Sequence, residues 1–347
     1  MLALQAFTPE PLAGALGIAV AEARKIIAAV HRGEPLATLA GLTGVTRRAM
    51  TAARTCGHVP TLEVRAVRPS AVDPFVKLAL ATGDGHVIEA VRIPLEREGR
   101  FSACVSSQAG CALACAFCAT GRLGLARNLE VWEIVEQVRL VRATLVAGQR
   151  VHGVVFQGMG EPLANVDRVI AAIRVMNDPC ALAIDSRAIT VCTSGLPSGI
   201  RQLAREAPKV RLGLSICSAR PDVRRRLMPI DAAHPLDDVL DAAEEHARTT
   251  GLAPMWAVTP LAGVNDSEED AVALAALVRR FESRSGVRPR LSIVPYNAID
   301  AAGLDPFSRG DVTQFIAHLI AQGVRPHLRY SGGGDVGAAC GQLAGTA

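Results

Sequence analysis

Apolar stretches of two kinds alternate along the chain from residue 100 onward. Short stretches of β type lie at residues 101–106, 151–157, 187–192, 210–216, 254–259 and 290–295. Longer segments with apolar residues at helical spacing lie at residues 129–147, 166–176, 198–206, 235–249, 267–284 and 309–321. Strands that alternate with helices favour a parallel sheet. We therefore predict an α/β fold whose sheet curls into a partial (β/α)6 barrel.

The pattern before residue 100 is different. Residues 11–31 and 35–54 carry apolar positions at helical spacing, which predicts short helices. Two β-type stretches follow at residues 75–82 and 86–93. The Gly-Asp-Gly sequence at residues 83–85 between them is a good signal for a hairpin turn.

These patterns divide the chain into four parts. We expect a small helical N-terminal module over residues 1–60, a bridging β-hairpin segment over residues 61–99, the partial barrel over residues 100–330 and a mobile C-terminal loop over residues 331–347. A chain of 347 residues is long enough for one large domain and a small accessory module.

The composition is that of a globular protein, because 50% of the residues are hydrophobic and 20% are charged. The chain does not open with a basic segment followed by an apolar one, and no uninterrupted apolar run approaches the ~20 residues of a membrane-spanning helix. We expect a cytoplasmic protein without a membrane partner. The nine cysteines, an odd number, then favour reduced or metal-bound thiols over a disulfide framework.

The net charge of +4 is weak evidence for a nucleic-acid partner. The densest basic group consists of Arg220, Arg224, Arg225 and Arg226, a pattern that is equally typical of a solvated helix face. Aromatic residues make up 3% of the chain, which argues against RNA binding by a row of stacked aromatic side chains.

Three cysteines in a compact run, Cys111, Cys115 and Cys118, carry the strongest chemical signal. Three thiolates can hold a four-iron cluster and leave one iron open, whereas electron-transfer clusters usually have four cysteines. Structural zinc sites also close with four protein ligands. The triplet therefore indicates a catalytic iron-sulfur cluster, with a zinc site completed by Cys104 or a distant histidine as the alternative.

Polar or glycine-rich strings follow most of the predicted strands. They begin at Cys111 after the first strand, at Gly158 after the second, at Thr193 after the third, at Ser215 after the fourth and at Tyr296 after the sixth. In α/β barrels the catalytic groups lie at the C-terminal ends of the strands. We therefore expect these strings to meet in one site.

Three longer strings extend this site. They are Cys104-Val-Ser-Ser-Gln-Ala-Gly-Cys111 continuing through Ala119-Thr120-Gly121, then Gly158-Met159-Gly160-Glu161-Pro162-Leu163, and finally Ala338-Ala339-Cys340-Gly341-Gln342-Leu343-Ala344-Gly345. Together they resemble the RlmN/Cfr family of radical S-adenosylmethionine (SAM) RNA adenine methyltransferases, from about residue 75 to the C-terminus. The resemblance implies a radical SAM barrel and a [4Fe-4S] cluster that is held by Cys111, Cys115 and Cys118 and binds SAM at its fourth iron.

The resemblance also implies contacts to SAM. Gly160 and Glu161 match the family's Gly-Glu string, although such a string alone is more typical of a strand-to-helix turn. Asn297 matches directly, whereas Cys192 replaces the first Ser of the family's Ser-Thr-Ser-Gly, and Ser215-Ile216-Cys217 replaces its Ser-Leu-His. A thiol thus takes the place of a hydroxyl and of an imidazole. Either cysteine is equally consistent with a small buried residue.

Three further residues take part in the mechanism that the resemblance implies. The thiolate of Cys340 accepts a methyl group from one SAM, and a radical from a second SAM removes hydrogen from that methyl group. The carbon then adds to the adenine ring, and Glu89 takes the ring proton. Cys104 attacks Cys340 to form a transient disulfide and free the product. From the residues alone, Glu89 in a strand is more typical of a solvent-facing position.

The segment before Cys340 departs from the family pattern. It reads Ser331-Gly-Gly-Gly-Asp335-Val-Gly337, where the family commonly has Arg-Gly-Asp-Asp, so only Asp335 of the acidic pair remains. Its glycines suit a mobile loop that presents Cys340 to two partners in turn. A disordered tail is the alternative.

We therefore predict a radical SAM RNA methyltransferase that modifies an adenine ring carbon, C2 in preference to C8. The expected substrate is 23S ribosomal RNA, with transfer RNA as the second candidate. We also expect a monomer that receives electrons from a donor such as flavodoxin or ferredoxin. Two alternatives stay open: a radical SAM enzyme of the protein-activating or maturation type that does not use Cys340, and a non-catalytic, zinc-stabilised RNA-binding protein.

Overall fold

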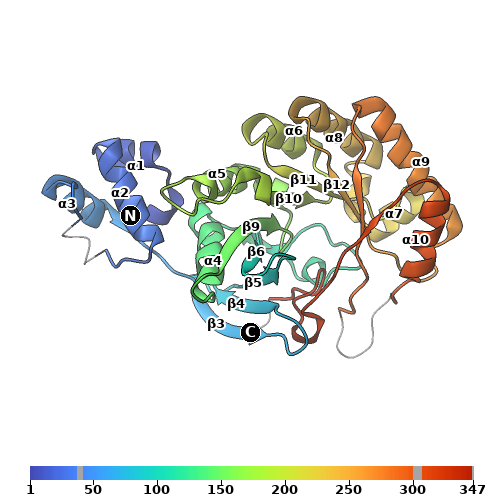
Figure 1. The fold of residues 1–347 in the computed structure, drawn as a ribbon, viewed down its shortest axis with the longest axis horizontal. Coiled ribbons are helices and arrows are strands. Elements are labelled where there is room, and N and C mark those ends of the chain that lie inside the picture. Colours follow the sequence, from blue (N-terminus) through green and yellow to red (C-terminus); the bar gives the residue numbers. More distant parts are fainter. Residues whose placement is uncertain (37–41, 300–306, 346–347) are drawn as a thin grey trace.

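The computed structural model describes residues 1–36, 42–299 and 307–345, and its centre is a single curved, open sheet (Figure 1). The strand order is β14-β13-β12-β11-β10-β9-β6-β5-β4-β3. The strands are β3 (Glu63–Pro69), β4 (Val76–Ala81), β5 (Val87–Pro94), β6 (Arg100–Cys104), β9 (Arg150–Phe156), β10 (Ile189–Thr193), β11 (Arg211–Ser215), β12 (Met255–Val258), β13 (Arg290–Ile293) and β14 (His327–Leu328). Two small pairs lie outside it, β1 (Leu2–Ala3) with β2 (Gly57–His58) and β7 (Gln108–Cys111) with β8 (Gly124–Asn128).

The helices follow the strands along the chain. They are α1 (Pro9–Leu16), α2 (Val20–His31), α3 (Arg47–Cys56), α4 (Val131–Ala143), α5 (Val166–Asn177), α6 (Pro197–Glu206), α7 (Pro221–Leu227), α8 (Leu236–Thr250), α9 (Glu268–Ser285) and α10 (Val312–Ala321). Short 3-10 turns are η1 (Leu4–Ala6), η3 (Thr120–Arg122), η4 (Pro162–Asn165), η5 (Ser186–Ala188), η6 (Pro229–Ala232) and η7 (Gly334–Val336). In the described ranges, no helix has the length and apolar character that crossing a membrane requires.

The predicted alternation of strands and helices is confirmed. Strands β6 and β9 to β14 are parallel to one another along the sheet. Figure 1 shows α4 to α6 and α8 to α10 along the outer side of this parallel part. Parallel strands bring their carboxyl ends to one edge of the sheet, so the loops after β9 to β13 gather there.

The predicted hairpin is also present, as β4 and β5, but it does more than bridge two parts. Its turn is closed by Thr82 N–H donating to the His86 carbonyl oxygen at 2.8 Å, with Gly85 at φ +87°. Strand β5 pairs antiparallel with β6, so the hairpin extends the main sheet. Strand β3 continues the sheet beyond β4 and was not predicted, because nearly all its side chains are exposed and leave no apolar alternation.

The N-terminal helices differ from the prediction. Residues 11–31 form two helices, because Gly17 ends α1 in a left-handed conformation, with φ +63°, and α2 starts only at Val20. Residues 37–41 of the second predicted stretch lie outside the described residues, and α3 begins at Arg47. Figure 1 shows α1 to α3 together at one end of the molecule, beside α4 and α5.

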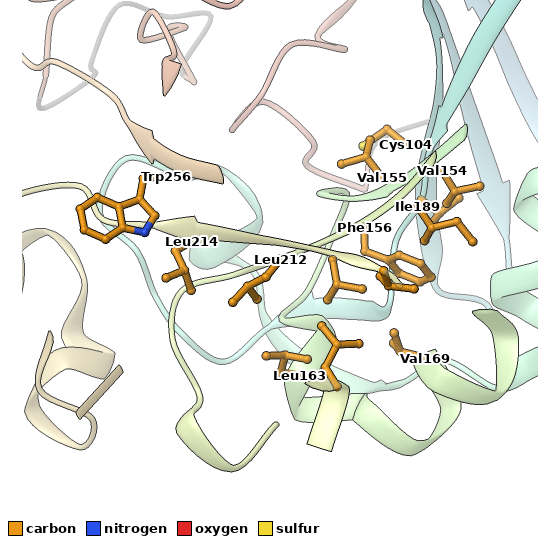
Figure 2. Close-up of a cluster of buried hydrophobic side chains, with 14 of the residues drawn as sticks. Cys104, Val154, Val155, Phe156, Leu163, Val169, Ile189, Leu212, Leu214 and Trp256 are labelled. Atoms are coloured by element: carbon orange, nitrogen blue, oxygen red, sulfur yellow. The ribbon is translucent and has the colours of Figure 1, made fainter. Parts of the chain in front are cut away.

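Apolar side chains between the sheet and its helices form the main core (Figure 2). Ile189 of β10 and Leu212 and Leu214 of β11 belong to it. Trp256 of β12 is fully buried and packs edge-to-face on Phe281 of α9, with ring centroids 5.1 Å apart. Each such side chain contributes roughly 1.5–3 kcal/mol to folding, so this layer keeps the strand ends in place.

The basic run on α7 is partly buried, so it is neither a uniform basic patch nor a uniformly solvated helix face. Arg224 is fully buried, whereas the Arg225 side chain is 61% exposed. The Arg224 guanidinium donates to Asp231 Oδ1 at 2.9 Å and to the carbonyl oxygens of Ser215 and Ser194, both at 2.8 Å. It therefore connects the ends of β10 and β11 to the turn after α7.

We predict that Arg224→Met lowers the free energy of unfolding by about 3–5 kcal/mol, because it leaves the buried Asp231 carboxylate with only the exposed Arg225 side chain, at 3.9 Å. Urea unfolding measures this. The control Arg225→Met, one residue along the same helix, should change the value by at most about 0.5 kcal/mol. Equal effects of the two substitutions would contradict the structural role of Arg224.

Candidate active site

A cavity of about 160 Å³ lies at the carboxyl ends of the parallel strands. Most of the predicted site residues line it: Cys111, Cys115, Cys118, Gly160, Glu161, Cys192, Ser215, Cys217, Asn297 and Cys340. Ile216 is fully buried next to Ser215 and is not part of the lining, and neither are Glu89 and Cys104. The expectation that these separate strings meet in one place therefore agrees with the cavity.

The cysteine triplet lies on a tightly packed loop within the β7–β8 hairpin. Cys111 is the last residue of β7. The Ala116 N–H donates to the Leu227 carbonyl oxygen at 2.9 Å, which attaches the loop to the end of α7. A Cβ atom on Gly121 would lie 3.0 Å from the Cys115 nitrogen, so the backbone at this point needs glycine. The three thiols are thus held by backbone contacts rather than by one another.

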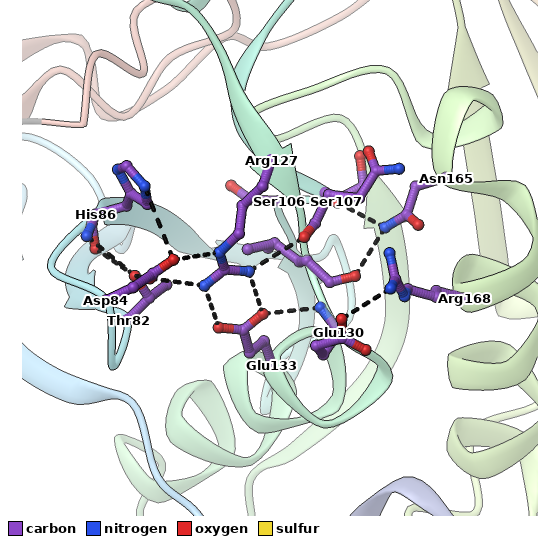
Figure 3. Close-up of polar contacts among 12 residues, drawn as sticks. Thr82, Asp84, His86, Ser106, Ser107, Arg127, Glu130, Glu133, Asn165 and Arg168 are labelled. Carbon is purple, nitrogen blue, oxygen red and sulfur yellow. Dashed lines mark hydrogen bonds and ion pairs between the residues drawn. The ribbon is translucent and has the colours of Figure 1, made fainter.

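A network of polar contacts braces this hairpin from outside (Figure 3). Arg127 of β8 donates to both carboxylate oxygens of Glu133 of α4 at 2.8 Å, and to Asp84 of the β4–β5 turn at 2.6 and 2.8 Å. The hydrogen bonds from Arg127 hold the pKa of Asp84 below its usual range. Asn165 donates to the Ser107 carbonyl oxygen at 2.9 Å. The hairpin is therefore attached to the sheet and to α4 on both sides.

The chemistry of the triplet fits an iron-sulfur cluster. Burial raises the pKa of Cys111 to about 11 and that of Cys115 to about 12, and the nearby Cys118 sulfur adds to both increases. Free thiols here would be protonated at neutral pH, whereas bound iron removes the proton outright. Within the described ranges, no three Cys, His, Asp or Glu side chains are placed to hold one metal ion. Three thiolates can hold a cluster of four irons, whereas a structural zinc site needs four protein ligands.

The glycines after β9 lie where no side chain fits. A Cβ atom on Gly158 would be 2.6 Å from the Val105 carbonyl group. Gly160 has φ +98°, and a Cβ atom there would be 2.5 Å from the Gln108 Cβ atom. Both positions bring the loop against the β6–β7 connection, so its backbone forms part of the cavity wall.

Glu161 is buried and organises the neighbouring loops. Its carboxylate accepts the Ser194 N–H at 2.8 Å and the Leu163 N–H at 2.9 Å. Burial raises its pKa, and these hydrogen bonds oppose the increase. Since Arg224 binds the carbonyl oxygen of the same Ser194, the loop after β10 is held from two sides.

The two cysteines that depart from the family pattern are uncharged parts of the wall. Burial raises the pKa of Cys192 and of Cys217 to about 12, so both thiols stay protonated. Cys217 has φ +62°, and its carbonyl oxygen accepts a hydrogen bond from Asn265 at 2.8 Å. The Cys192 sulfur lies 2.8 Å from the place of a Cβ atom on Gly213, so only glycine at 213 leaves room for it.

The C-terminal segment is packed in this structure around Cys340. Asn297 donates through Nδ2 to the Cys340 carbonyl oxygen at 3.2 Å and to the Ser331 hydroxyl at 2.8 Å. The Ala119 N–H, just after the triplet, donates to the Gly341 carbonyl oxygen at 2.8 Å. Any movement of Cys340 away from the triplet must break these contacts.

The remaining acidic residue of the segment has a clear structural role. Asp335 accepts hydrogen bonds from the Ser70 hydroxyl and the Ala71 N–H, both at 2.8 Å, and these contacts lower its pKa. Asp73 accepts the Gly333 N–H at 2.9 Å. The segment is therefore anchored to the connection between β3 and β4 before it reaches the cavity.

Cys104 and Cys340 share a second, smaller cavity of about 50 Å³. Cys340 lines this cavity as well as the larger one, so its thiol lies in the wall between them. Both cysteines are free thiols here. Burial raises the pKa of Cys104, and the positive charge of Arg329 opposes the increase, whereas Cys340 is exposed.

Arg329 is a site residue that the sequence analysis missed. It lines the smaller cavity with the two thiols, and its guanidinium has a weak acceptor, the Met255 sulfur at 3.8 Å. Its charge also lowers the pKa of Cys192. No motif surrounds it in the sequence, so only its place beside the thiols reveals it.

Glu89 is fully buried, in contrast to a solvent-facing strand residue, and lies outside the lining of both cavities. One carboxylate oxygen accepts from Lys77 Nζ at 3.2 Å. The other accepts the Ala344 N–H at 3.0 Å. A Cβ atom on Gly337 would lie 3.2 Å from the same Lys77 nitrogen. The ion pair thus contacts the C-terminal segment on both sides of Cys340.

Known proteins resemble this chain over nearly its whole length. The radical SAM superfamily matches residues 105–276. A probable RNA methyltransferase of Sorangium cellulosum is 60% identical over 356 residues, which cover 97% of this chain and 90% of that protein. A probable dual-specificity RNA methyltransferase RlmN of Synechococcus sp. is 41% identical over 279 residues, covering 80% and 77%. The crystal structure of a radical SAM methyltransferase from Sphaerobacter thermophilus has a TM-score of 0.87 and 31% identity, and the match covers 100% of both chains.

These similarities decide between the functions that the sequence analysis left open. A chain this close to radical SAM RNA methyltransferases is neither a zinc-stabilised binding protein nor a maturation enzyme. The chain belongs to the RlmN/Cfr family of radical SAM RNA methyltransferases, enzymes that use a [4Fe-4S] cluster and SAM.

Proposed function

We propose that this enzyme methylates a ring carbon of adenine, C2 in preference to C8, with 23S ribosomal RNA as the leading substrate and transfer RNA as the second. The observation that carries the proposal is the position of Cys340, which lines both the cavity of the triplet and the cavity of Cys104. Relatives named dual-specificity RNA methyltransferases RlmN support the RNA substrate.

In this proposal the wall residues of the larger cavity divide the work of binding. Cys111, Cys115 and Cys118 hold the cluster, and the residues around SAM are Gly160, Glu161, Cys192, Ser215, Ile216, Cys217 and Asn297. When bound, cluster and SAM supply one-electron chemistry that removes hydrogen from an unactivated carbon. The protein contributes position, close backbone approach at the glycines and exclusion of water.

Cys340 acts first as a nucleophile and later as the covalent link to the base. Its thiol must lose a proton before the sulfur attacks a methyl carbon, which costs free energy at any pH below the pKa of the thiol. The positive charge of Arg329 lowers that cost. After the methyl carbon has bonded to the adenine ring, Cys340 holds the RNA through a carbon-sulfur bond.

Two further groups complete the reaction in the proposal. Glu89 takes the ring proton, which requires the Ala344 N–H to release one of its carboxylate oxygens. The deprotonated Cys104 sulfur then attacks the Cys340 sulfur, so a sulfur-sulfur bond forms as the carbon-sulfur bond breaks. The released carbon takes the electron pair and a proton and becomes the methyl group of the product. A thiol reductant must reduce the disulfide before the next turnover. The shared cavity of Cys104 and Cys340 supports this step.

The proposal extends to the organisation of the enzyme. The strands from β6 to β13 serve as the partial (β/α)6 barrel, residues 1–60 as an accessory module, residues 61–99 as a bridging segment and residues 331–347 as the loop that carries Cys340. The enzyme works in the cytoplasm as a monomer and receives electrons from flavodoxin or ferredoxin.

Mapping of adenosine methylation by mass spectrometry tests the substrate. Ribosomal RNA from cells without this protein should lack a C2-methylated adenosine that is present with it. The wild-type gene should restore the modification, and a Cys340→Ala gene should not. Ribosomal and transfer RNA with unchanged methylation in the deletion strain would overturn the proposal.

The cluster assignment predicts that Cys115→Ala loses iron and reductive SAM cleavage together, because two thiolates cannot hold four irons in place. Anaerobic reconstitution followed by iron analysis and a SAM cleavage assay measures both. Cys180→Ala, which removes a thiol next to the N-terminal helices, is the matched control and should keep both properties. A Cys115→Ala protein with full iron and cleavage would show that the assignment is wrong.

The two catalytic thiols should fail at different stages. Cys340→Ala has no methyl acceptor and should give neither methylated enzyme nor methylated RNA. Cys104→Ala lacks only the releasing thiol, so it should purify with RNA covalently attached through Cys340. Mass spectrometry of ribonuclease-treated protein detects the adduct. Normal turnover by Cys104→Ala, or RNA methylation by Cys340→Ala, would exclude this mechanism.

A further inference from the structure

A third cavity lies at the opposite end of the parallel strands from Cys340. Its volume is about 330 Å³, which falls at the low end of the range for small-molecule sites. It is lined by residues at the amino ends of β10 to β14, including Arg211 of β11, Arg290 of β13 and His327 of β14. No assigned step of the methylation reaction takes place at this end.

Basic side chains dominate the lining. Arg187, Lys209, Arg211 and Arg290 contribute four positive charges, and no acidic residue lines the cavity. None of these four side chains makes an ion pair or a hydrogen bond within the part of the chain that the structure describes. Like charges around one concave surface repel one another and attract anions. The positive electrostatic potential of the cavity therefore favours the binding of a multivalent anion.

A hydroxyl that faces the cavity adds a neutral hydrogen-bond donor to its lining. Ser292 of β13 lines the cavity and is only 4% exposed. Its hydroxyl has no hydrogen-bond partner among the described residues. The oxygen itself is not among the fully buried unpaired side-chain atoms of the described residues, so water reaches it through the cavity and a ligand oxygen can take that water's place. The half-buried Thr190 lines the same space.

The remaining wall is apolar. Leu252, Ala253 and Met255, at the start of β12, line the cavity beside the basic residues. An apolar wall contributes nothing to the binding of inorganic phosphate, but it can pack against a base or another carbon skeleton. The lining thus fits an amphipathic anion.

A packed layer separates this space from the larger cavity. Met255 lines the lower cavity and Cys192 lines the larger one. Both side chains pack against Gly213. A Cβ atom at this position would lie 2.8 Å from the Cys192 sulfur and 3.4 Å from the Met255 methyl carbon. A ligand in the lower cavity therefore does not share the space of SAM.

We propose that the lower cavity is a binding site for a small phosphorylated molecule of the nucleoside monophosphate class. Its phosphate contacts Arg211, Arg290 and the Ser292 hydroxyl, and its base packs on the Met255 wall. A phosphate of bound RNA is the other source of the same chemistry. The free molecule is favoured, because a five-residue strand separates the two ends by about 16 Å and an RNA with its adenine at Cys340 would have to pass around the sheet.

Calorimetric titration of the anaerobically purified, cluster-containing protein tests the proposal. The probes are uridine monophosphate, which lacks the adenine of SAM, inorganic phosphate and a single-stranded RNA oligonucleotide. Uridine monophosphate should bind at one site and more tightly than phosphate. Arg211→Gln and Arg290→Gln should each weaken it about tenfold, the value of one charge-assisted contact. Arg205→Gln, which changes an exposed arginine of α6 outside the cavity, should not weaken it.

SAM affinity, measured in the same proteins, shows that each variant is folded and should not change. Three results would overturn the proposal. The first is no binding of uridine monophosphate, and the second is binding that Arg211→Gln and Arg290→Gln leave unchanged or that SAM displaces. The third is a loss of affinity in Arg211→Gln and Arg290→Gln that is seen with the RNA oligonucleotide but not with uridine monophosphate. That result would show that the two arginines bind the RNA backbone.

Discussion

The peptide group of Ser194 is held from both sides by buried charges, and the shape of the active site depends on this contact. The Glu161 carboxylate accepts its N–H, and the Arg224 guanidinium donates to its carbonyl oxygen. Glu161 follows β9, Ser194 follows β10 and Arg224 lies on the helix after β11, so three successive strand ends are fixed to one another. Buried charges of this kind are stable only with all their partners present, which makes the strand ends a cooperative unit.

The same edge of the sheet holds several thiols whose pKa is raised. Burial raises the pKa of Cys104, Cys192 and Cys217, and reactive cysteines are those with a lowered pKa. The charge of Arg329 opposes this increase for Cys104 and Cys192, and the charge of Arg224 opposes it for Cys217. A cluster of protonated thiols resists oxidation and wrong metals, while iron can still displace the protons of the triplet.

Sequence patterns predicted the features that depend on local order along the chain. The alternation of strands and helices, the β4–β5 hairpin and the gathering of the glycine-rich and cysteine strings all follow from periodicity and from where parallel strands end. The missed features depend on residues distant in the sequence. The sequence pattern predicts an exposed Arg224, but its burial depends on Asp231 and two strand ends that the fold brings next to it. It also predicts an exposed Glu89, whose carboxylate binds the Ala344 N–H from the far end of the chain. The apolar spacing predicts one helix through residue 17, but Gly17 ends α1 there in a left-handed conformation.

The position of Cys340 in the wall between two cavities has a kinetic consequence. A long arm that carried a thiol between distant partners would move on the nanosecond to microsecond scale of loops, or more slowly. A thiol that already borders both spaces can change partner by rotation about its own χ1 bond, among three staggered positions, in picoseconds to nanoseconds. In the reaction proposed above, the order of events at Cys340 is then set by which space is filled, and the peptide on either side can keep its hydrogen bonds to Asn297 and Ala119 throughout.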